Sequence, residues 1–265
     1  MLQTRVLSAI IGGPILLYLI YKGSGFIFFL TAVLVLLALN EIFAMSLELG
    51  VKAWRISGYV AGLLFCFGAY REPSRFLPFL IILWLIYCLT RFVWEFPRSN
   101  LQDLSFNFLA ACYVSLLFSH LILLRELNQG IYLTFLAIAL TWATDTGAYF
   151  VGRAIGRNKL APLVSPNKTI EGAIGGLIFA VGVSLAVGYM FPNNSLSPVS
   201  LILLGLAVGI TGQLGDLVES AIKRIAGVKD SGKLIPGHGG VLDRFDSILF
   251  TVPTVYYLFL GLIIS

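Results

Sequence analysis

A polar stretch rich in groups that bind phosphate and metal ions lies between two apolar segments near the C-terminus. It runs from Ser220 to Asp246 and reads SAIKRIAGVKDSGKLIPGHGGVLDRFD. Lys and Arg side chains bind phosphate oxygens, and Gly residues let the backbone approach a ligand closely. Charges are costly at membrane depth, so a cluster this polar beside apolar helices indicates a functional site. The residue types favour chemistry on a phosphorylated substrate at a membrane surface.

The acids on either side of this stretch have helical spacing. Asp216, Ser220 and Lys223 are spaced i, i+4 and i+7, which places them on one face of a helix. Asp243 and Asp246 are three residues apart and share a face of the next helix. A compact loop joins the two helices, so we expect them to be antiparallel neighbours with Asp216 near Asp243. Carboxylate oxygens suit Mg²⁺, and paired ions are common in phosphoryl and nucleotidyl transfer. The alternative is that these acids pair with Lys or Arg, or cap helices.

The linking loop supplies positive charge and flexible backbone. Its Gly239–Gly240 pair leads into a helix, whose N-terminal amides favour an anion. His238 can donate to a phosphate, ligate a metal or act as an acid, or it can simply bond to backbone. The loop alone is also compatible with an anchor for anionic lipid. The candidate phosphate-binding residues of the stretch are Lys223, Arg224, Lys229 and Lys233.

A second basic loop, GRAIGRNKLAPLVSPNKTIEGAIGG, begins at Gly152. Its SPNKTIEG segment resembles a helix start, with Thr169 placed before Glu171. Asn167 and Lys168 in this segment are candidates for binding a cofactor or nucleotide. Asp145 lies just upstream in an apolar segment, where an acid is a functional hypothesis by default. The alternative for the whole loop is an ordinary positively charged membrane loop with capping residues.

The composition is that of a helical membrane protein. Of 265 residues, 58% are hydrophobic and only 12% are charged, and the mean hydropathy is +0.92. Soluble domains carry roughly twice that charge. Apolar runs of about 17 to 25 residues, each long enough to cross a bilayer, recur along the chain. We therefore predict an all-α, polytopic membrane protein.

About nine spans are expected from these runs, and their loops predict an orientation. With a cytoplasmic N-terminus and an external C-terminus, 14 of the 18 Lys and Arg residues lie inside, which follows the positive-inside rule. Both long basic loops then face the cytoplasm. We predict two bundles, residues 1–125 and 126–265, with catalysis in the second. The expected spans are 7–22, 25–47, 56–70, 76–94, 104–124, 130–151, 171–191, 199–222 and 241–264.

The sequence resembles the phosphatidate cytidylyltransferases, also called CDP-diacylglycerol synthases. The family signature is a Ser, then Lys-Arg, Lys-Asp, a small residue, His-Gly-Gly and Asp-Arg-x-Asp, and this chain matches it throughout. The resemblance extends to TDTGAYFVGRAIGRNKL and SPNKTIEGAIGG, whereas the N-terminal half matches mainly in hydropathy and in its TRVLSA opening. The matching residues are Ser220, Lys223, Arg224, Lys229, Asp230, Gly232, His238, Gly239, Gly240, Asp243, Arg244 and Asp246.

This resemblance implies that CTP and phosphatidic acid react to give CDP-diacylglycerol and pyrophosphate, with Mg²⁺ required. The family's paired-metal pattern maps onto Asp216 and Asp243, with Asp246 as a further ligand or as a residue that holds the ligands. The second ion could be monovalent. Lys223 and Arg224 join the acids as catalytic residues. The binding residues are Lys229, Lys233, His238, Gly239, Gly240, Asn167 and Lys168.

Two other functions fit parts of the pattern. A CTP-dependent lipid kinase of the polyprenol type would transfer the γ-phosphate instead. An ion-coupled transporter would also contain intramembrane acids, but we see no internal repeat and no matched pair of broken helices. We expect an integral enzyme of the inner (plasma) membrane of the cell with its active site facing the cytoplasm. The family allows a homodimer, and no nucleic acid partner is expected.

Overall fold

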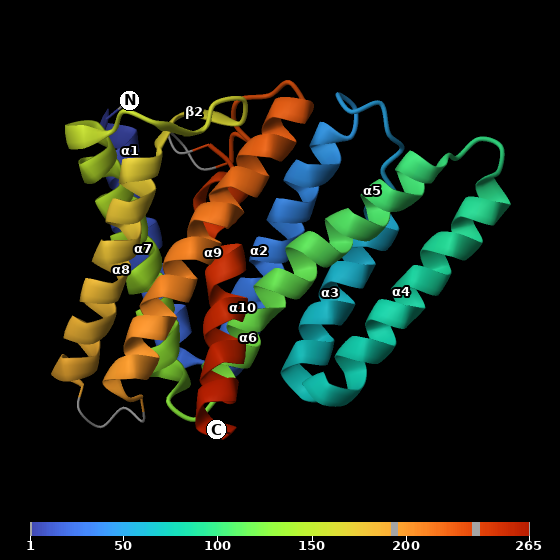
Figure 1. The fold of residues 1–265 in the computed structure, drawn as a ribbon. Coiled ribbons are helices and arrows are strands. Elements are labelled where there is room, and N and C mark those ends of the chain that lie inside the picture. The colour runs from blue at the N-terminus through green and yellow to red at the C-terminus, as the bar shows by residue number, and fades with distance from the viewer. Residues whose placement is uncertain (1, 192–195, 235–238, 265) are drawn as a thin grey trace. The chain divides into compact units, whose positions relative to one another are not determined.

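The structure is a computed structural model, and it describes residues 2–191, 196–234 and 239–264 (Figure 1). The chain divides into two compact units. The first contains residues 1–126 with 225–244, and the second contains residues 127–224 with 245–265. The predicted bundles, 1–125 and 126–265, stay a prediction. Segment 225–244 carries much of the polar stretch. It belongs to the predicted second bundle but to the first of the two observed units.

The first unit consists of apolar helices packed around an aromatic core. Phe65 and Trp84 are almost completely buried there together with Cys88. Asn100 caps the fifth helix through a capping box with Asp103, as expected for this residue pair. The helices are α1 (Leu2–Lys22), α2 (Ser24–Met45), α3 (Arg55–Arg71), α4 (Pro73–Glu95), α5 (Leu101–Ala111), the π-helical turn η1 (Cys112–Leu116) and α6 (Leu117–Glu126).

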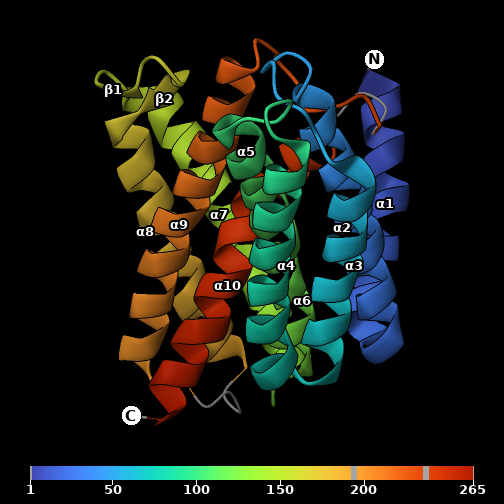
Figure 2. The same ribbon diagram turned by 90° about the vertical axis from the view of Figure 1, so that its right-hand side faces the viewer.

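The second unit contains long helices and one short hairpin. Helices α7 and α8 lie side by side along their length, as both views show (Figures 1 and 2). Helices α9 and α10 are also in close contact, because a Cβ at Gly215 of α9 would lie 2.5 Å from the carbonyl oxygen of Asp246. The elements are α7 (Gly130–Ile155), β1 (Lys159–Ala161), β2 (Ser165–Thr169), α8 (Ile170–Met190), α9 (Pro198–Ile225) and α10, which begins in the first unit and spans Leu242–Ile264.

The hairpin lies within the second basic loop. Strands β1 and β2 are antiparallel, and Lys159 pairs with Thr169. Thr169 then caps α8, because its Oγ1 accepts a hydrogen bond from the N–H of Gly172 at 3.1 Å. The predicted helix start is therefore confirmed. The strands themselves were not expected, since we treated this segment as a loop.

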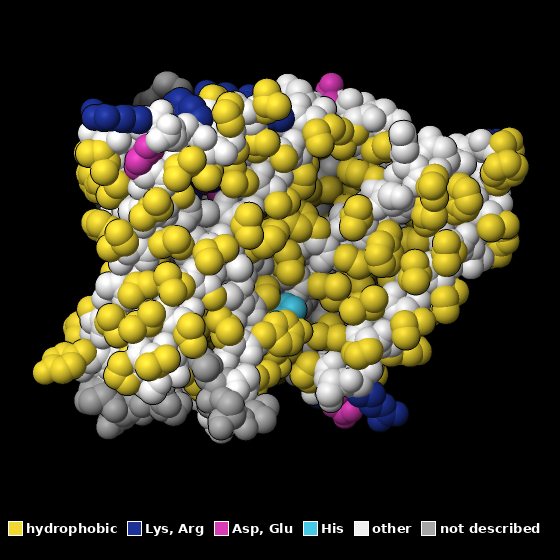
Figure 3. Space-filling model, in the orientation of Figure 1, with side chains coloured by type: hydrophobic (Ala, Val, Ile, Leu, Met, Phe, Trp, Pro, Cys, Tyr) yellow, Lys and Arg dark blue, Asp and Glu magenta, His cyan; other side chains and the backbone are white. Residues whose placement is uncertain are grey.

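The lengths of the helices and the exposed apolar side chains are those of a membrane protein. Five helical segments in the described part of the chain are long and apolar enough to cross a bilayer: Ser24–Met45, Pro73–Glu95, Leu101–Glu126, Ile170–Met190 and Pro198–Ile225. Large apolar side chains such as Trp142, Phe150 and Ile178 are exposed, and hydrophobic side chains cover much of the face in Figure 3. The expected spans coincide closely with helices. The number of spans and the orientation of the termini stay predictions.

Candidate active site

Asp216 on α9 is paired with a lysine from the hairpin. Lys168 Nζ on β2 lies 2.6 Å from Asp216 Oδ2. Ser220, one turn further along α9, donates from its hydroxyl to Asp216 Oδ1 at 3.2 Å. Asp216 and Ser220 therefore lie on the same face of α9, as their spacing predicted. The ion pair also joins the second basic loop to this face of α9.

Two more acids approach this ion pair. Asp145 on α7 and Asp246 on α10 lie close enough to Asp216, and to Lys168, for their charges to interact. We call Asp145, Asp216, Asp246 and Lys168 the acidic cluster. Four separate elements, α7, β2, α9 and α10, bring these side chains together. Within the cluster the carboxyl groups outnumber the ammonium, and this imbalance favours an additional cation.

A cavity of about 500 Å³ opens beside the acidic cluster. Its volume lies within the range of about 300 to 1,000 Å³ that is common for small-molecule sites. Asn167, which we predicted to bind a cofactor or nucleotide, lines it together with Arg153 and Gln213. Lys168, Asp145 and Asp216 line it too. Lys and Arg side chains also gather near the β1–β2 hairpin (Figure 3). The cavity therefore offers both cationic and acidic groups to a charged ligand.

The two basic residues at the end of α9 have protein partners. Lys223 Nζ lies 2.7 Å from Oε2 of Glu219, whose side chain is buried. Arg224 donates from Nε to the carbonyl oxygen of Val164, in the hairpin turn, at 3.2 Å. Lys223 thus shares its charge with an acid that we had not assigned to the site. The guanidinium of Arg224 ties the end of α9 to the hairpin that carries Lys168.

Asp243 lies in a separate group of hydrogen bonds in the first unit. Its Oδ2 accepts from the N–H of Ser231 at 2.9 Å, from the hydroxyl of Ser231 at 2.9 Å and from the N–H of Gly240 at 2.8 Å. Glu41 on α2 accepts from the N–H groups of Val241 and Leu242. It also accepts from the hydroxyl of Ser231 at 2.9 Å. We call Glu41, Ser231, Gly240, Val241, Leu242 and Asp243 the capping network.

The remaining predicted residues lie on the loop between α9 and α10. Lys229 and Lys233 are exposed. Gly239 has a φ of +84°, a left-handed conformation that favours glycine. His238 falls outside the described residues. The proximity of Asp216 to Asp243, which the sequence predicted, stays a prediction.

The donor atoms of the acidic cluster fit a hard cation by their chemistry. Asp145, Asp216 and Asp246 present carboxylate oxygens, the ligand type that Mg²⁺ prefers. In the described part of the chain, no group of His, Cys, Asp and Glu side chains is spaced as a ready-made metal site. The ammonium of Lys168 instead provides the positive charge beside Asp216. Binding a divalent ion there would require the acids to draw together.

Sequence reasoning missed one acid, Glu41, and left two others, Asp145 and Glu219, without a role. Asp145 was flagged as an acid in an apolar segment, but it was not assigned to the site. Glu41, in the segment LALNEIFAM, gave the same signal and was overlooked. Asp145 lies in the TDTGAYFVGR segment that shares the family resemblance, whereas Glu41 is far from every such segment, so only the fold connects Glu41 to the signature.

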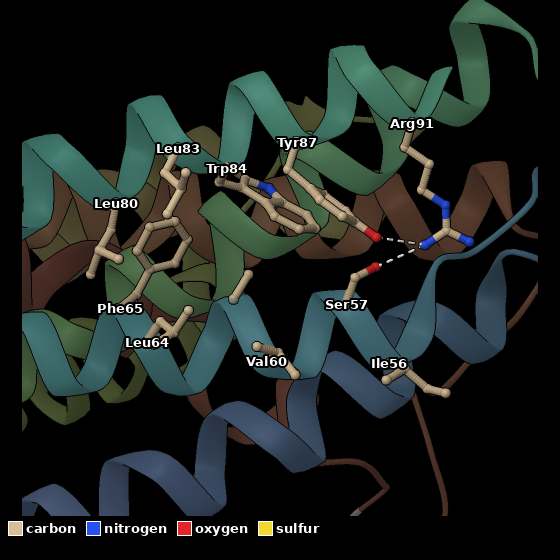
Figure 4. A pocket seen from close by; sticks show the side chains of 11 residues that line it. Ile56, Ser57, Val60, Leu64, Phe65, Leu80, Leu83, Trp84, Tyr87 and Arg91 are labelled. Carbon is tan, nitrogen blue, oxygen red and sulfur yellow. Dashed lines mark hydrogen bonds between the residues drawn. The ribbon is translucent and has the colours of Figure 1, made fainter. Parts of the chain in front are cut away.

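A second cavity, of about 470 Å³, lies between α3 and α4 in the first unit (Figure 4). Among the described residues, none that we predicted for the site lines it. Its walls are largely apolar, with Arg91 at one end donating to Tyr87 Oη and Ser57 Oγ. The guanidinium also pairs with Glu95 at 2.8 Å. Its lining contains no acid, so this cavity lacks the groups expected of a metal-dependent nucleotide site.

Comparison with known proteins places the chain in a family. The sequence model of the cytidylyltransferase family matches residues 3–262. A phosphatidate cytidylyltransferase of Bacillus subtilis is 46% identical over 158 residues, which cover 59% of this chain and 58% of that protein. Those of Staphylococcus saprophyticus and Staphylococcus epidermidis are 34% and 35% identical over 259 residues, which cover 95% of this chain and 96% of each relative. Because the family model matches nearly the whole length of this chain, the chain belongs to the cytidylyltransferase family.

Proposed function

We propose that this membrane enzyme transfers the cytidylyl group of CTP to phosphatidic acid, giving CDP-diacylglycerol and pyrophosphate. The observation that carries the proposal is the acidic cluster, in which Lys168 pairs with Asp216 and interacts with the charges of Asp145 and Asp246, beside a cavity lined partly by charged side chains. The names of the relatives, which are phosphatidate cytidylyltransferases, support the choice of substrate.

The reaction needs little covalent help from the protein. The phosphate of phosphatidic acid is anionic at neutral pH, so one of its oxygens can attack the α-phosphorus of CTP directly. A new P–O bond forms, and the bond from the α-phosphorus to the oxygen that bridges to the β-phosphorus breaks. Pyrophosphate leaves with that electron pair. The barrier comes mostly from crowding of negative charge, so charge neutralisation is the main task of the site.

The chain's own residues are proposed to hold and neutralise the substrates. Mg²⁺, when bound, would balance phosphate charge and stabilise the leaving pyrophosphate. We retain Asp216, Asp243 and Asp246 as its ligands, with a second ion that could be monovalent. Lys168 places an ammonium beside the cavity, where it can bind a phosphate oxygen of CTP. The remaining proposed phosphate contacts are Lys223, Arg224, Lys229, Lys233, His238, Asn167, Gly239 and Gly240.

We also propose how the enzyme is oriented in its membrane. The bias of Lys and Arg toward one set of loops supports a cytoplasmic N-terminus and an active site on the cytoplasmic face of the inner membrane. CTP would then reach the site from the cytoplasm, while the acyl chains of phosphatidic acid stay in the bilayer. A homodimer also stays a proposal.

A labelling experiment tests this function directly. The purified protein in detergent micelles is given Mg²⁺, CTP carrying radioactive phosphorus at either the α or the γ position, and either phosphatidic acid or a polyprenol as the acceptor. We expect α-label in an organic-extractable lipid and γ-label in pyrophosphate. A γ-labelled lipid, formed with a polyprenol acceptor, would instead identify a CTP-dependent lipid kinase. If neither label enters lipid, an enzyme of either kind is excluded and a transporter becomes the better hypothesis.

A further inference from the structure

Glu41 is a buried acid on a helix that the signature does not include. It lies near the end of α2, which is otherwise strongly apolar, and its residue exposure is 5%. A buried carboxylate is costly unless hydrogen bonds compensate for the lost water. Its partners should therefore indicate why an acid is present at this position.

The partners of Glu41 are at the start of α10. Its Oε1 accepts from the N–H of Val241 at 2.7 Å, and its Oε2 accepts from the N–H of Leu242 at 2.9 Å. The first N–H groups of a helix lack partners within the helix, and the helix dipole favours a negative charge there. Glu41 therefore acts as a capping carboxylate supplied from a helix 200 residues away in sequence.

Ser231 links this cap to Asp243. Its hydroxyl lies 2.9 Å from Glu41 Oε2 and 2.9 Å from Asp243 Oδ2. Because a hydroxyl has one proton, it can donate to only one of the two carboxylates at a time. The N–H of Ser231 and the N–H of Gly240 also donate to Asp243 Oδ2. The backbone donors to Asp243 thus directly adjoin those that Glu41 holds at Val241 and Leu242, and the Ser231 hydroxyl lies between the two carboxylates.

Close packing around Glu41 accounts for two of the signature residues. A Cβ at Gly232 would lie 2.7 Å from Glu41 Oε1. A Cβ at Gly240 would lie 2.5 Å from Glu41 Oε2 and would also collide with Ser231 Oγ. A Cβ at either position would push the Glu41 side chain away from its hydrogen-bond partners, so both positions favour glycine. The signature loop and this acid of α2 are complementary in shape as well as in hydrogen bonding.

We propose that Glu41 is a positioning residue: it holds the start of α10 and, through Ser231, fixes the carboxylate of Asp243 for the reaction. This inference rests on the proposed function, in which Asp243 is a ligand of Mg²⁺. Residues that orient metal ligands typically change metal affinity or activity by about 10- to 100-fold when they are replaced.

The direct test replaces Glu41 with an amide of the same size. In Glu41→Gln one side-chain oxygen is replaced by an NH₂ group, which would face backbone N–H groups instead of accepting from them. We expect kcat to fall about 10- to 100-fold and Mn²⁺ binding, followed by electron paramagnetic resonance, to weaken about tenfold or more. Amide hydrogen exchange should become faster at Val241 and Leu242. Glu48→Gln removes an exposed acid just after α2 and should match wild type in all three measurements.

A second substitution keeps the test decisive if Glu41→Gln does not fold. Ser231→Ala removes only the bridging hydroxyl and should weaken Mn²⁺ binding in the same direction. If both variants fold, their effects should be less than additive in a double-mutant cycle, because they break one linked network. Glu41→Asp keeps the charge on a shorter side chain and should recover part of the lost binding.

The outcomes separate this inference from the proposed function. If Glu41→Gln matches wild type in Mn²⁺ binding and in exchange at Val241 and Leu242, Glu41 has no positioning role. If Glu41→Gln does not fold and Ser231→Ala leaves Mn²⁺ binding unchanged, the link to Asp243 is also refuted. Failure of the wild type to form a liponucleotide would overturn the proposed function. The Mn²⁺ and exchange results on Glu41 would still decide the structural claim, because neither depends on turnover.

Discussion

The capping network and the acidic cluster both gather carboxyl groups, but different partners stabilise them. In the capping network, backbone N–H groups and one hydroxyl donate to Glu41 and Asp243. In the acidic cluster, the ammonium of Lys168 faces the acids, in addition to the hydroxyl of Ser220 that donates to Asp216. Neutral donors fix the direction of a carboxylate without cancelling its charge, whereas an ammonium cancels charge and can be displaced by another cation. The first arrangement therefore suits a pre-oriented ligand, and the second suits a site whose charge changes as substrates bind.

Asp243→Asn should have the largest effect, because it removes the charge that the capping network orients. The amide keeps the size of the side chain and one acceptor oxygen, so the fold should persist. We expect kcat to fall by at least about 100-fold, measured with labelled CTP in detergent micelles. Near-normal turnover in a variant with a wild-type thermal melt would remove Asp243 from the catalytic machinery.

Lys168→Gln should have an intermediate effect, because it removes the cation of the acidic cluster. Hydrogen bonds to charged groups contribute about 1.5 to 3 kcal/mol, so we expect the KM for CTP to rise about tenfold or more. Lys159→Gln is the matched control, because Lys159 is an exposed lysine on the partner strand of the same hairpin. Equal KM values for the two variants would mean that Lys168 does not contact the nucleotide.

Thr169→Ala should have the smallest effect, because it acts on the support of Lys168 and leaves every charge in place. Loss of this helix cap should lower the free energy of unfolding by about 1 kcal/mol, seen as a lower melting temperature in detergent. Thr169→Ser keeps the hydroxyl and should stay near wild type. A melting temperature unchanged by Thr169→Ala would show that the hydrogen bond to Gly172 contributes nothing to stability.

Local patterns were sufficient to predict the helices and part of the site. Apolar runs located the helices, the order of Thr169 and Glu171 located the start of α8, and helical spacing placed Ser220 beside Asp216. The hairpin was missed because its strands are only three and five residues long, and β2 contains a proline, Pro166. Strands so short show no clear alternation of polar and apolar residues.

Sequence patterns could not predict the contacts between segments that are distant along the chain. Glu41 meets residues 200 positions further along the chain, and no local periodicity encodes such a pairing. Asp145 carried a usable signal as an acid in an apolar helix, but nothing in its spacing connected it to Asp216. The partner of Lys168 was likewise undetermined until the hairpin was placed against α9.

The dependence of the signature loop on α2 limits how these enzymes can be recombined. A chimera that joins the last three helices of this chain to the leading helices of a distant homologue would retain every signature residue. It would nevertheless lack the buried acid unless the donor sequence supplied one at the position of Glu41. Such hybrids should insert into the membrane normally and yet work poorly, and restoring that single glutamate should repair them. The space for that glutamate is already present in the hybrid, because Gly232 and Gly240 come from this chain and carry no side chain to overlap it.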